Sequence, residues 1–390
     1  MAKGIQVPVT PELVSWARIT SGLTLEEASD LVHEPLSLLL AWERGEAKPS
    51  LTQGKALAHA YRRPLAALLL PEVPPEPPVP VDFRPGASGK GRRITRPILL
   101  AIRKARRMQE AARQIFGSLD PTGPVFEAAS VHDGPEKLAR DHRSLLGVTL
   151  GTQLSWSTDH QALSAWRIAV ERLNVLVLQS SMPVEEVRAF SLSTSDPPAI
   201  VLNSSDAVVA RIFSLFHELG HLALGQQGIC DPTVALEHVD TAFEEEQFCN
   251  SFAGALLVPS SALVSDSLAK AVASNRSPAN PLGSLAGRYR VSRQVMWYRL
   301  RDVGLIDEVT FTDGWTLLAW KEPHAAEHKG EFVSPPTWRR VLSEGGRVFV
   351  SRMLEALDRG LVSPADMIDW LEIKTSDIGK LEQQLVTAPE

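Results

Sequence analysis

The sequence predicts an α+β fold that is mainly helical, with a small β-sheet and more than one domain. Apolar residues recur at helical spacing through residues 1–70 and through most of the chain after residue 96. Three short β-like runs lie close together between residues 175 and 202. A length of 390 residues suits two or three domains of roughly 150 residues each.

Composition and charge exclude several classes of protein. Hydrophobic residues make up 44% and charged residues 22% of the chain, which excludes wholesale disorder. A formal net charge of −6 argues against a general nucleic-acid binder, although local basic patches remain possible. The only cysteines, Cys230 and Cys249, exclude a secreted cystine scaffold. Because apolar runs such as Leu65–Leu70 are too short to span a membrane and the N-terminus lacks an apolar signal core, we expect a cytoplasmic protein.

Four short helices are predicted within residues 1–70. The first opens at Pro11 and ends before Gly22, and the second begins at a capping box formed by Thr24 and Glu27. The third and fourth are expected over Pro35–Trp42 and Ser50–Tyr61. Together they predict a small all-α domain.

A change of composition follows this domain. Residues 71–85 contain seven prolines, which prevent a helix or a central strand and predict a stiff linker. Residues 84–113 contain ten Lys or Arg and a single acid, Glu110, and the pattern is helical from Pro97 onward. This basic segment either grips phosphates or forms a solvated or docked helix face.

The remaining elements alternate between helical and extended patterns. We expect helices over 136–173, strands at Val175–Leu178, Ala189–Leu192 and Ala199–Leu202, a long apolar helix capped by Asp206 and ending at Gly225, a helix over Phe243–Leu257, two helices over 283–304 and a small helical region over 336–386.

The strongest chemical signal is His217-Glu218-Leu219-Gly220-His221. Residues i and i+4 share one face of a helix, so both imidazoles are placed to bind one tetrahedral Zn²⁺. Glu218 is placed to act as the general base on a water that the metal activates. Two core histidines could match this spacing by chance. The strongly apolar flanking sequence favours the metal, because polar side chains on a buried helix need partners.

A third metal ligand is needed, and the next long helix offers one. Glu246 is the expected ligand, and Asn250, one turn later, is placed to hold a ligand histidine. Adjacent acids usually form a solvated face, so Glu244 and Glu245 remain alternatives. Cys249 is a rival, since thiolates bind zinc well, although its phenylalanine neighbours favour a core position.

Three further residues are weaker candidates. His238 lies between the two metal helices and is expected to be exposed, with oxyanion stabilisation as the alternative. Cys230 has no partner nearby in the sequence and is expected to be structural. Asn203 ends the strand Ala199–Asn203. An exposed edge on that strand would hold a substrate backbone by strand addition and place Asn203 near the cleft, unless Asn203 is a turn residue.

These motifs resemble two known families. The central part of the chain resembles the ImmA/IrrE metallopeptidases in the segments Asp82–Arg84, Val201–Asn203, Arg211–Leu222, Glu246–Ala253, Leu256–Pro259, Leu285–Ser292 and Arg299-Leu300. The first domain resembles the Xre-type helix-turn-helix in Trp16–Arg18, Gly22–Thr24, Trp42–Gly45, Pro49 and Arg63–Leu65.

The resemblance implies both an architecture and an activity. It implies an Xre-like helix-turn-helix domain at 1–70, a Pro-rich and basic linker at 71–95, a zincin-like metallopeptidase domain at 96–310 and a helical C-terminal domain at 311–390. It also implies zinc ligands at His217, His221 and Glu246, with Glu218 as the general base. The expected reaction is hydrolysis of a peptide bond in a partner protein, an Xre-type repressor, in a stress-response or mobile-element circuit.

DNA binding by the first domain is an open question at this level. Its third helix, Pro35–Trp42, has almost no side chains that hydrogen-bond base edges, and residues 1–70 carry seven basic and seven acidic residues. DNA contact through residues 1–70 and the basic segment 84–113 is one expectation, and contact with another Xre-like domain is the other. The alternative function is therefore a transcription regulator, or an antitoxin-like interaction protein, whose peptidase part is a sensor.

Overall fold

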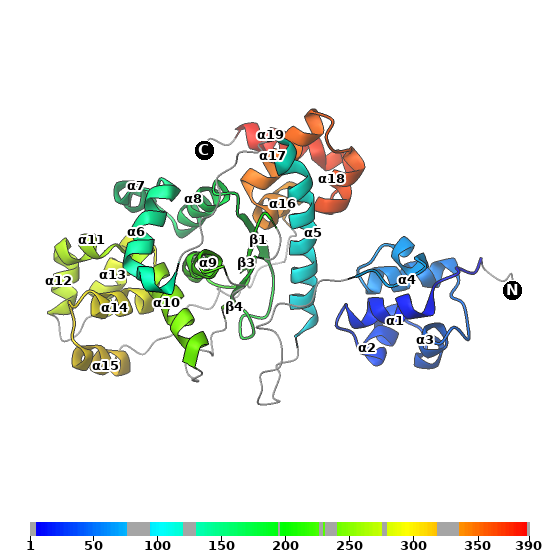
Figure 1. Ribbon diagram of the computed structural model, residues 1–390, viewed down its shortest axis with the longest axis horizontal. Coiled ribbons are helices and arrows are strands. Elements are labelled where there is room, and N and C mark those ends of the chain that lie inside the picture. The colour runs from blue at the N-terminus through cyan, green and yellow to red at the C-terminus, as the bar shows by residue number, and fades with distance from the viewer. Residues whose placement is uncertain are drawn as a thin grey trace. The chain divides into compact units, whose positions relative to one another are not determined.

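The computed structural model describes residues 5–75, 94–119, 130–193, 196–225, 229–230, 240–274, 279–317 and 335–387 (Figure 1). The chain forms two compact units, Met1–Lys104 and Ala105–Glu390. Helices predominate in both units and one small sheet lies in the second, so the predicted α+β class is confirmed. In the described part of the chain, no helix combines the length and apolar character that a membrane crossing requires.

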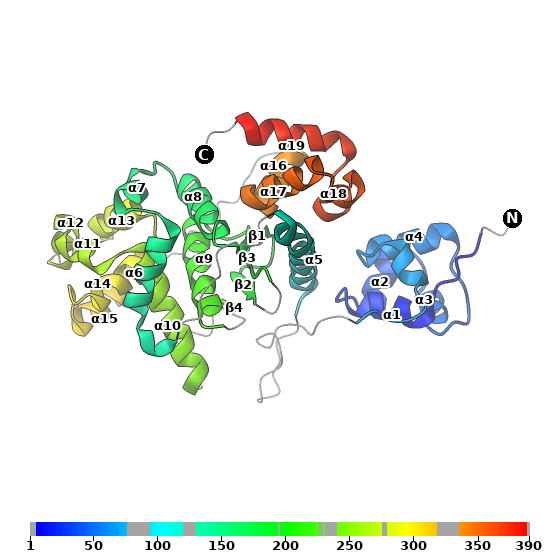
Figure 2. The same cartoon turned by 45° about the horizontal axis from the view of Figure 1, so that its top comes forward.

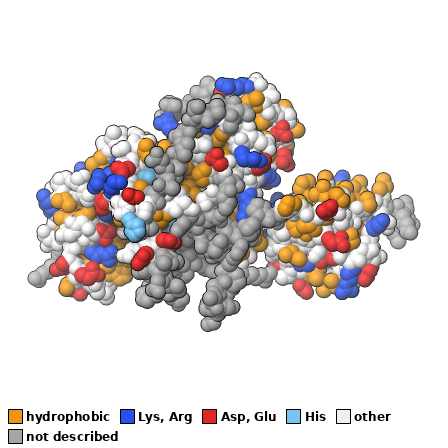
Figure 3. Space-filling view, in the orientation of Figure 1, with side chains coloured by type: hydrophobic (Ala, Val, Ile, Leu, Met, Phe, Trp, Pro, Cys, Tyr) orange, Lys and Arg blue, Asp and Glu red, His pale blue; other side chains and the backbone are white. Residues whose placement is uncertain are grey.

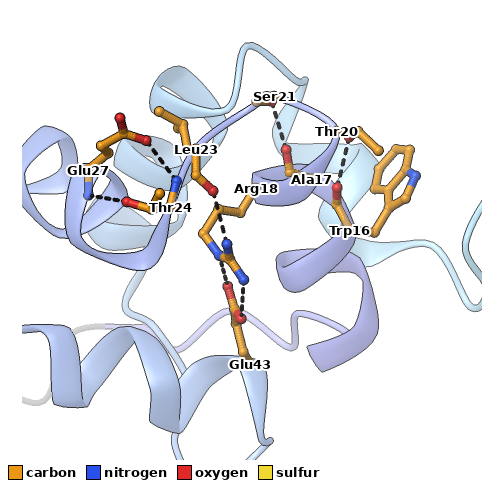
Figure 4. Close-up of polar contacts among 9 residues, drawn as sticks. All are labelled: Trp16, Ala17, Arg18, Thr20, Ser21, Leu23, Thr24, Glu27 and Glu43. Atoms are coloured by element: carbon orange, nitrogen blue, oxygen red, sulfur yellow. Dashed lines mark hydrogen bonds and ion pairs between the residues drawn. The ribbon is translucent and has the colours of Figure 1, made fainter. Parts of the chain in front are cut away.

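The first unit is a bundle of short helices around one apolar core. Its elements are α1 (Pro11–Ile19), α2 (Leu25–Val32), α3 (Leu36–Glu43), α4 (Leu51–Ala60) and the 3-10 helix η1 (Leu65–Leu69). Trp42 and Tyr61 are fully buried in the core, beside Leu39 and Leu57. All four predicted helices are present, and the predicted capping box of Thr24 and Glu27 forms at the start of α2 (Figure 4).

The first turns of α5 (Arg96–Leu119) complete this unit. Gly22 has a φ of +70°, and a Cβ there would lie 2.9 Å from Leu99 Cδ1, so glycine allows α5 to approach closely. Arg96 donates to the carbonyl of Ala60, and Arg103 donates to the carbonyls of Tyr61 and Arg62. These two arginines of the basic segment therefore cap the end of α4. Residues 84–93 lie outside the described residues.

The sheet of the second unit has four strands in the order β1-β3-β2-β4. They are β1 (Leu176–Ser180), β2 (Ala189–Leu192), β3 (Ala199–Asn203) and β4 (Ile229–Cys230). β3 pairs in parallel with β1 and antiparallel with β2, so both of its edges are occupied. The expectation of an exposed edge on Ala199–Asn203 is therefore wrong, because β2 folds back along it.

Helices cover the sheet and build the core of this unit. They are α6 (Pro135–Leu146), α7 (Leu150–Ser155), α8 (Asp159–Glu171), α9 (Val208–Ala223), α10 (Asp240–Leu257), α11 (Ser260–Ser265), α12 (Ser267–Ala273), α13 (Ala279–Tyr289), α14 (Arg293–Asp302) and α15 (Glu308–Leu317). The apolar helix α9 lies between the sheet and α10 (Figures 1 and 2). Trp166 of α8 packs edge-on against Phe216 of α9, which buries the middle of α9.

The start of α9 differs from the prediction. Asp206 does not cap the helix: the N-cap position is Ala207, and no side chain caps it. The Asp206 carboxylate instead accepts from the backbone N–H of Ala207 and pairs with Arg188 at 3.3 Å. The ion pair with Arg188 holds the Asp206 side chain away from the first turn of the helix.

The last four helices form a small lobe of the second unit (Figure 2). They are α16 (Thr337–Gly345), α17 (Arg347–Asp358), α18 (Pro364–Leu371) and α19 (Thr375–Thr387), and Ser363 caps the start of α18. Phe349 packs edge-on against Phe116 of α5, and Arg167 donates to the carbonyl of Ser343. The lobe thus continues the fold of the second unit, while the boundary placed at residue 310 from the sequence stays a prediction.

Candidate metal centre

The buried helix α9 presents three polar side chains. His217, Glu218 and His221 are all buried, as expected from the apolar sequence on either side. The two imidazoles lie one turn apart on the same face, and their Nε2 atoms are 3.1 Å from each other. Such a pair of buried nitrogens requires a common partner.

α10 supplies that partner. One oxygen of Glu246 lies 3.3 Å from His217 Nε2, and the other lies 3.1 Å from His221 Nε2. Ligand atoms of the three residues lie within 4.8 Å of one another, the spacing of a metal-binding cluster. The structure therefore brings together the three residues singled out as metal ligands.

The spacing of these donors suits a tetrahedral zinc ion. Zn–N and Zn–O distances of about 2.0–2.1 Å place neighbouring ligand atoms roughly 3.3 Å apart. The observed separations of 3.1 and 3.3 Å match that edge length. Two imidazoles and one carboxylate also form a donor set that leaves a fourth position open for chemistry.

The electrostatics of the cluster favour an ionised carboxylate at Glu246. Partial burial opposes ionisation of Glu246, but the hydrogen bonds and charges of His217 and His221 outweigh it and lower its pKa to about 2. Glu246 is therefore ionised at neutral pH, which is the state that a metal requires of its ligand.

Asn250, one turn after Glu246, contacts the second ring nitrogen of His217, Nδ1. Its Oδ1 lies 3.0 Å from His217 Nδ1. Because Asn250 Oδ1 accepts at Nδ1, the Nε2 lone pair of His217 would be free for a metal once the Nε2 proton is displaced. The pairing predicted for Asn250 with a histidine of this motif is thus present in the structure.

The alternative ligands lie outside this cluster. Cys249 is fully buried, with its sulfur against Gly220 rather than among the ligand atoms. Glu244 and Glu245 are also absent from the cluster of described ligand atoms. Among the acids and thiols weighed from the sequence, only Glu246 converges with the histidines.

The weaker candidates do not add to the site. Asn203 is fully buried and is a turn residue: its Oδ1 accepts from the N–H groups of Met182 and Ser205, and its Nδ2 donates to the carbonyls of Met182 and Val187. The backbone of Cys230 belongs to β4. His238 lies outside the described residues.

Several positioning residues were not recognised from the sequence. The last carbonyls of α10 and the one just after it have no partners within the helix, and side chains from other elements satisfy them. The partly buried Arg143 donates to the Leu256 carbonyl, and the buried Gln153 and Arg299 donate to those of Leu257 and Val258. Gly254 makes room for Arg299, since a Cβ there would lie 2.9 Å from its Cδ. These contacts fix α10, and α10 in turn carries Glu246.

Two models of known protein families match parts of this chain. The family model of the IrrE N-terminal-like domain, a peptidase family, matches residues 170–301 and so spans the sheet, α9, α10 and α14. A helix-turn-helix family model matches residues 14–68, which suggests DNA binding. No curated protein and no solved structure matches the chain significantly. The chain therefore combines a metallopeptidase-like domain of the ImmA/IrrE type with an N-terminal Xre-type helix-turn-helix domain.

Proposed function

We propose that this chain is a cytoplasmic zinc-dependent endopeptidase that cleaves a partner protein, an Xre-type transcriptional repressor, in a stress-response or mobile-element circuit. The observation that carries the proposal is the convergence of His217, His221 and Glu246 from two buried helices, with Glu218 buried in the same turn. A metal-sensing scaffold needs the three ligands but has no use for a buried carboxylate at position 218.

The chain's own residues have separate tasks in this reaction. His217, His221 and Glu246 would hold the zinc ion, and Asn250 would keep the imidazole of His217 in place. When bound, zinc supplies a Lewis acid that polarises the scissile carbonyl and makes water more acidic. Glu218 takes the proton of the attacking water and passes it to the leaving amine.

The decisive variant is Glu218→Gln, which keeps the size of the side chain but removes the base. We expect loss of cleavage with the zinc content unchanged. Wild type and variant are each co-expressed with the helix-turn-helix repressors encoded near the gene. Mass spectrometry then reports shortened repressor, and elemental analysis of the purified chain reports zinc. Glu244→Gln, on the exposed side of α10, is the matched control and should cleave normally. A repressor shortened equally by the Glu218→Gln chain would refute the proposal.

A second candidate is a DNA-binding regulator whose peptidase part only senses metal or a partner. The match of residues 14–68 to a helix-turn-helix family favours it. A salt-dependent gel shift of the full chain on the promoter next to its gene tests this candidate, because phosphate contacts weaken as salt rises. A shift that survives Glu218→Gln, together with no cleavage by the wild type, would favour the regulator.

A further inference from the structure

The two helices that form the helix-turn-helix pair carry acids and no bases. Residues 25–43, which span α2 and α3, contain five acidic residues and neither lysine nor arginine: Glu26, Glu27, Asp30, Glu34 and Glu43. The net charge of residues 1–70 is zero, but most of its acidic residues and all of its basic residues lie in different segments. The basic residues of this unit all lie outside its helix-turn-helix pair.

Two of the five acids have structural tasks (Figure 4). Glu43 accepts two hydrogen bonds from the Arg18 guanidinium, at 2.7 and 3.1 Å. Glu27 accepts from the backbone N–H of Thr24 and caps α2. The other three form no ion pair with any residue that the structure describes, and the Glu34 carboxylate accepts a hydrogen bond from the side chain of Gln53. Among the described residues, the carboxylates of Glu26, Asp30 and Glu34 therefore keep an unpaired negative charge.

Exposed leucines accompany these acids. Leu31, near the end of α2, is 46% exposed, and Leu36, at the start of α3, is 36% exposed. Glu26 and Asp30 lie one turn apart on the same face of α2, since residues at i and i+4 are neighbours on a helix. Leu31 follows Asp30 in the chain, and Glu34 lies in the turn to Leu36. We call these five residues the acidic–apolar surface. Hydrophobic side chains also cover much of the face of this unit that Figure 3 shows.

This surface has the wrong charge for DNA. In a helix-turn-helix the second helix reads bases and the first crosses the phosphate backbone. Here the second helix, α3, offers only Ser37 as an exposed uncharged polar side chain, and no Arg, Lys, Asn or Gln. The first helix, α2, carries Glu26 and Glu27 in its first turn, and these acids repel phosphates from a helix N-terminus that would otherwise attract them.

We propose that the acidic–apolar surface docks the positively charged, DNA-reading face of a helix-turn-helix repressor. Charge complementarity selects this occupant: a face built to bind phosphates is basic, and uncompensated carboxylates attract it as phosphates do. Leu31 and Leu36 supply the apolar contact that gives such a complex its affinity. The inference rests on the proposed function, since the docked repressor is the protein to be cut.

The experiment measures binding by the full chain carrying Glu218→Gln, so that no probe is consumed. The probes are the purified helix-turn-helix repressors encoded in the same genome, each labelled with a fluorophore, and a DNA duplex of mixed sequence. We expect at least one repressor to bind, more weakly as salt rises, and to be displaced by its own operator. The pair Glu26→Lys with Asp30→Lys should weaken this binding at least about tenfold. The matched pair Glu12→Lys with Glu72→Lys, at exposed acids outside α2 and α3, should change it less than about twofold.

Three outcomes would overturn the inference. One is that no repressor binds. Another is that the two charge-reversed pairs weaken binding equally. The third is that the chain binds the duplex, or a second copy of itself, through this surface more tightly than any repressor. The proposed function and the docking surface fail by different results. A repressor that binds but is not cut by the wild-type chain would refute the peptidase activity. Cleavage that is unchanged by Glu26→Lys with Asp30→Lys would refute the docking surface.

Discussion

Gly220 of α9 lies directly against Cys249 of α10. A Cβ built on Gly220 would be 3.1 Å from the Cys249 sulfur and 3.3 Å from its Cα. The absence of a side chain at Gly220 lets α10 approach the helix that carries His217 and His221. The distance between these two helices decides whether Glu246 reaches both histidines.

A larger side chain at Gly220 should therefore open the site. We expect Gly220→Val to push α10 away, to lower zinc content and to cost about 1–3 kcal/mol of unfolding free energy, as overpacking does. Gly287→Val on α13 is the matched control, because no atom lies within 4 Å of a Cβ at Gly287. Elemental analysis and urea unfolding measure the two effects. Equal zinc content in the two variants would contradict the role assigned to Gly220.

The support given by Asn250 can be tested without disturbing the core. Asn250 is exposed and lies 3.0 Å from His217 Nδ1. Removing a residue that orients a metal ligand typically costs about 10–100-fold in affinity. We expect this loss for Asn250→Ala in a zinc competition titration with a chromogenic chelator. Gln247→Ala, also exposed on α10, should titrate like the wild type, and an unchanged affinity for Asn250→Ala would refute the support.

The spacing of residues in the sequence predicts the three candidate metal ligands. It does not predict the side chains that hold α10 in place. His217 and His221 share a helix face because they are four residues apart, and Glu246 lies on the next long helix in the chain. The carbonyls that Arg143 and Arg299 satisfy come from α10, more than 40 residues away from Arg299 and more than 100 from Arg143. Hydrogen bonds between residues so far apart depend on tertiary packing, which cannot be predicted from a local sequence pattern.

The same limit explains the errors at β3 and α9. The short apolar run Ala199–Leu202 predicts a strand but not its neighbours, and β2 lies along the edge that was expected to be open. Asp206 has the side chain of a helix cap, yet Arg188 from another segment competes for its carboxylate. In both cases a long-range partner overrides a correct local signal.

The last prediction concerns Glu171, which is fully buried on α8 where the C-terminal lobe packs. Its carboxylate accepts from the N–H of Val348 at 3.2 Å and lies 3.8 Å from the Arg167 guanidinium. Burial raises the pKa of Glu171 to about 7, against the opposing effect of Arg167. A carboxyl whose folded pKa lies above its unfolded value binds its proton more tightly when folded. It therefore stabilises the fold most at low pH, and this stability is lost as pH rises toward 7.

Glu171→Gln removes this titration but keeps an oxygen for the Val348 N–H. We expect the variant to gain about 2–3 kcal/mol of unfolding free energy relative to the wild type between pH 5 and pH 8. Urea unfolding at four values across that range measures the difference. Glu308→Gln, at an exposed carboxylate on α15, provides the control and should follow the wild type at every pH. A Glu171→Gln difference that stays constant with pH would show that Glu171 keeps the same charge in the folded and unfolded chain.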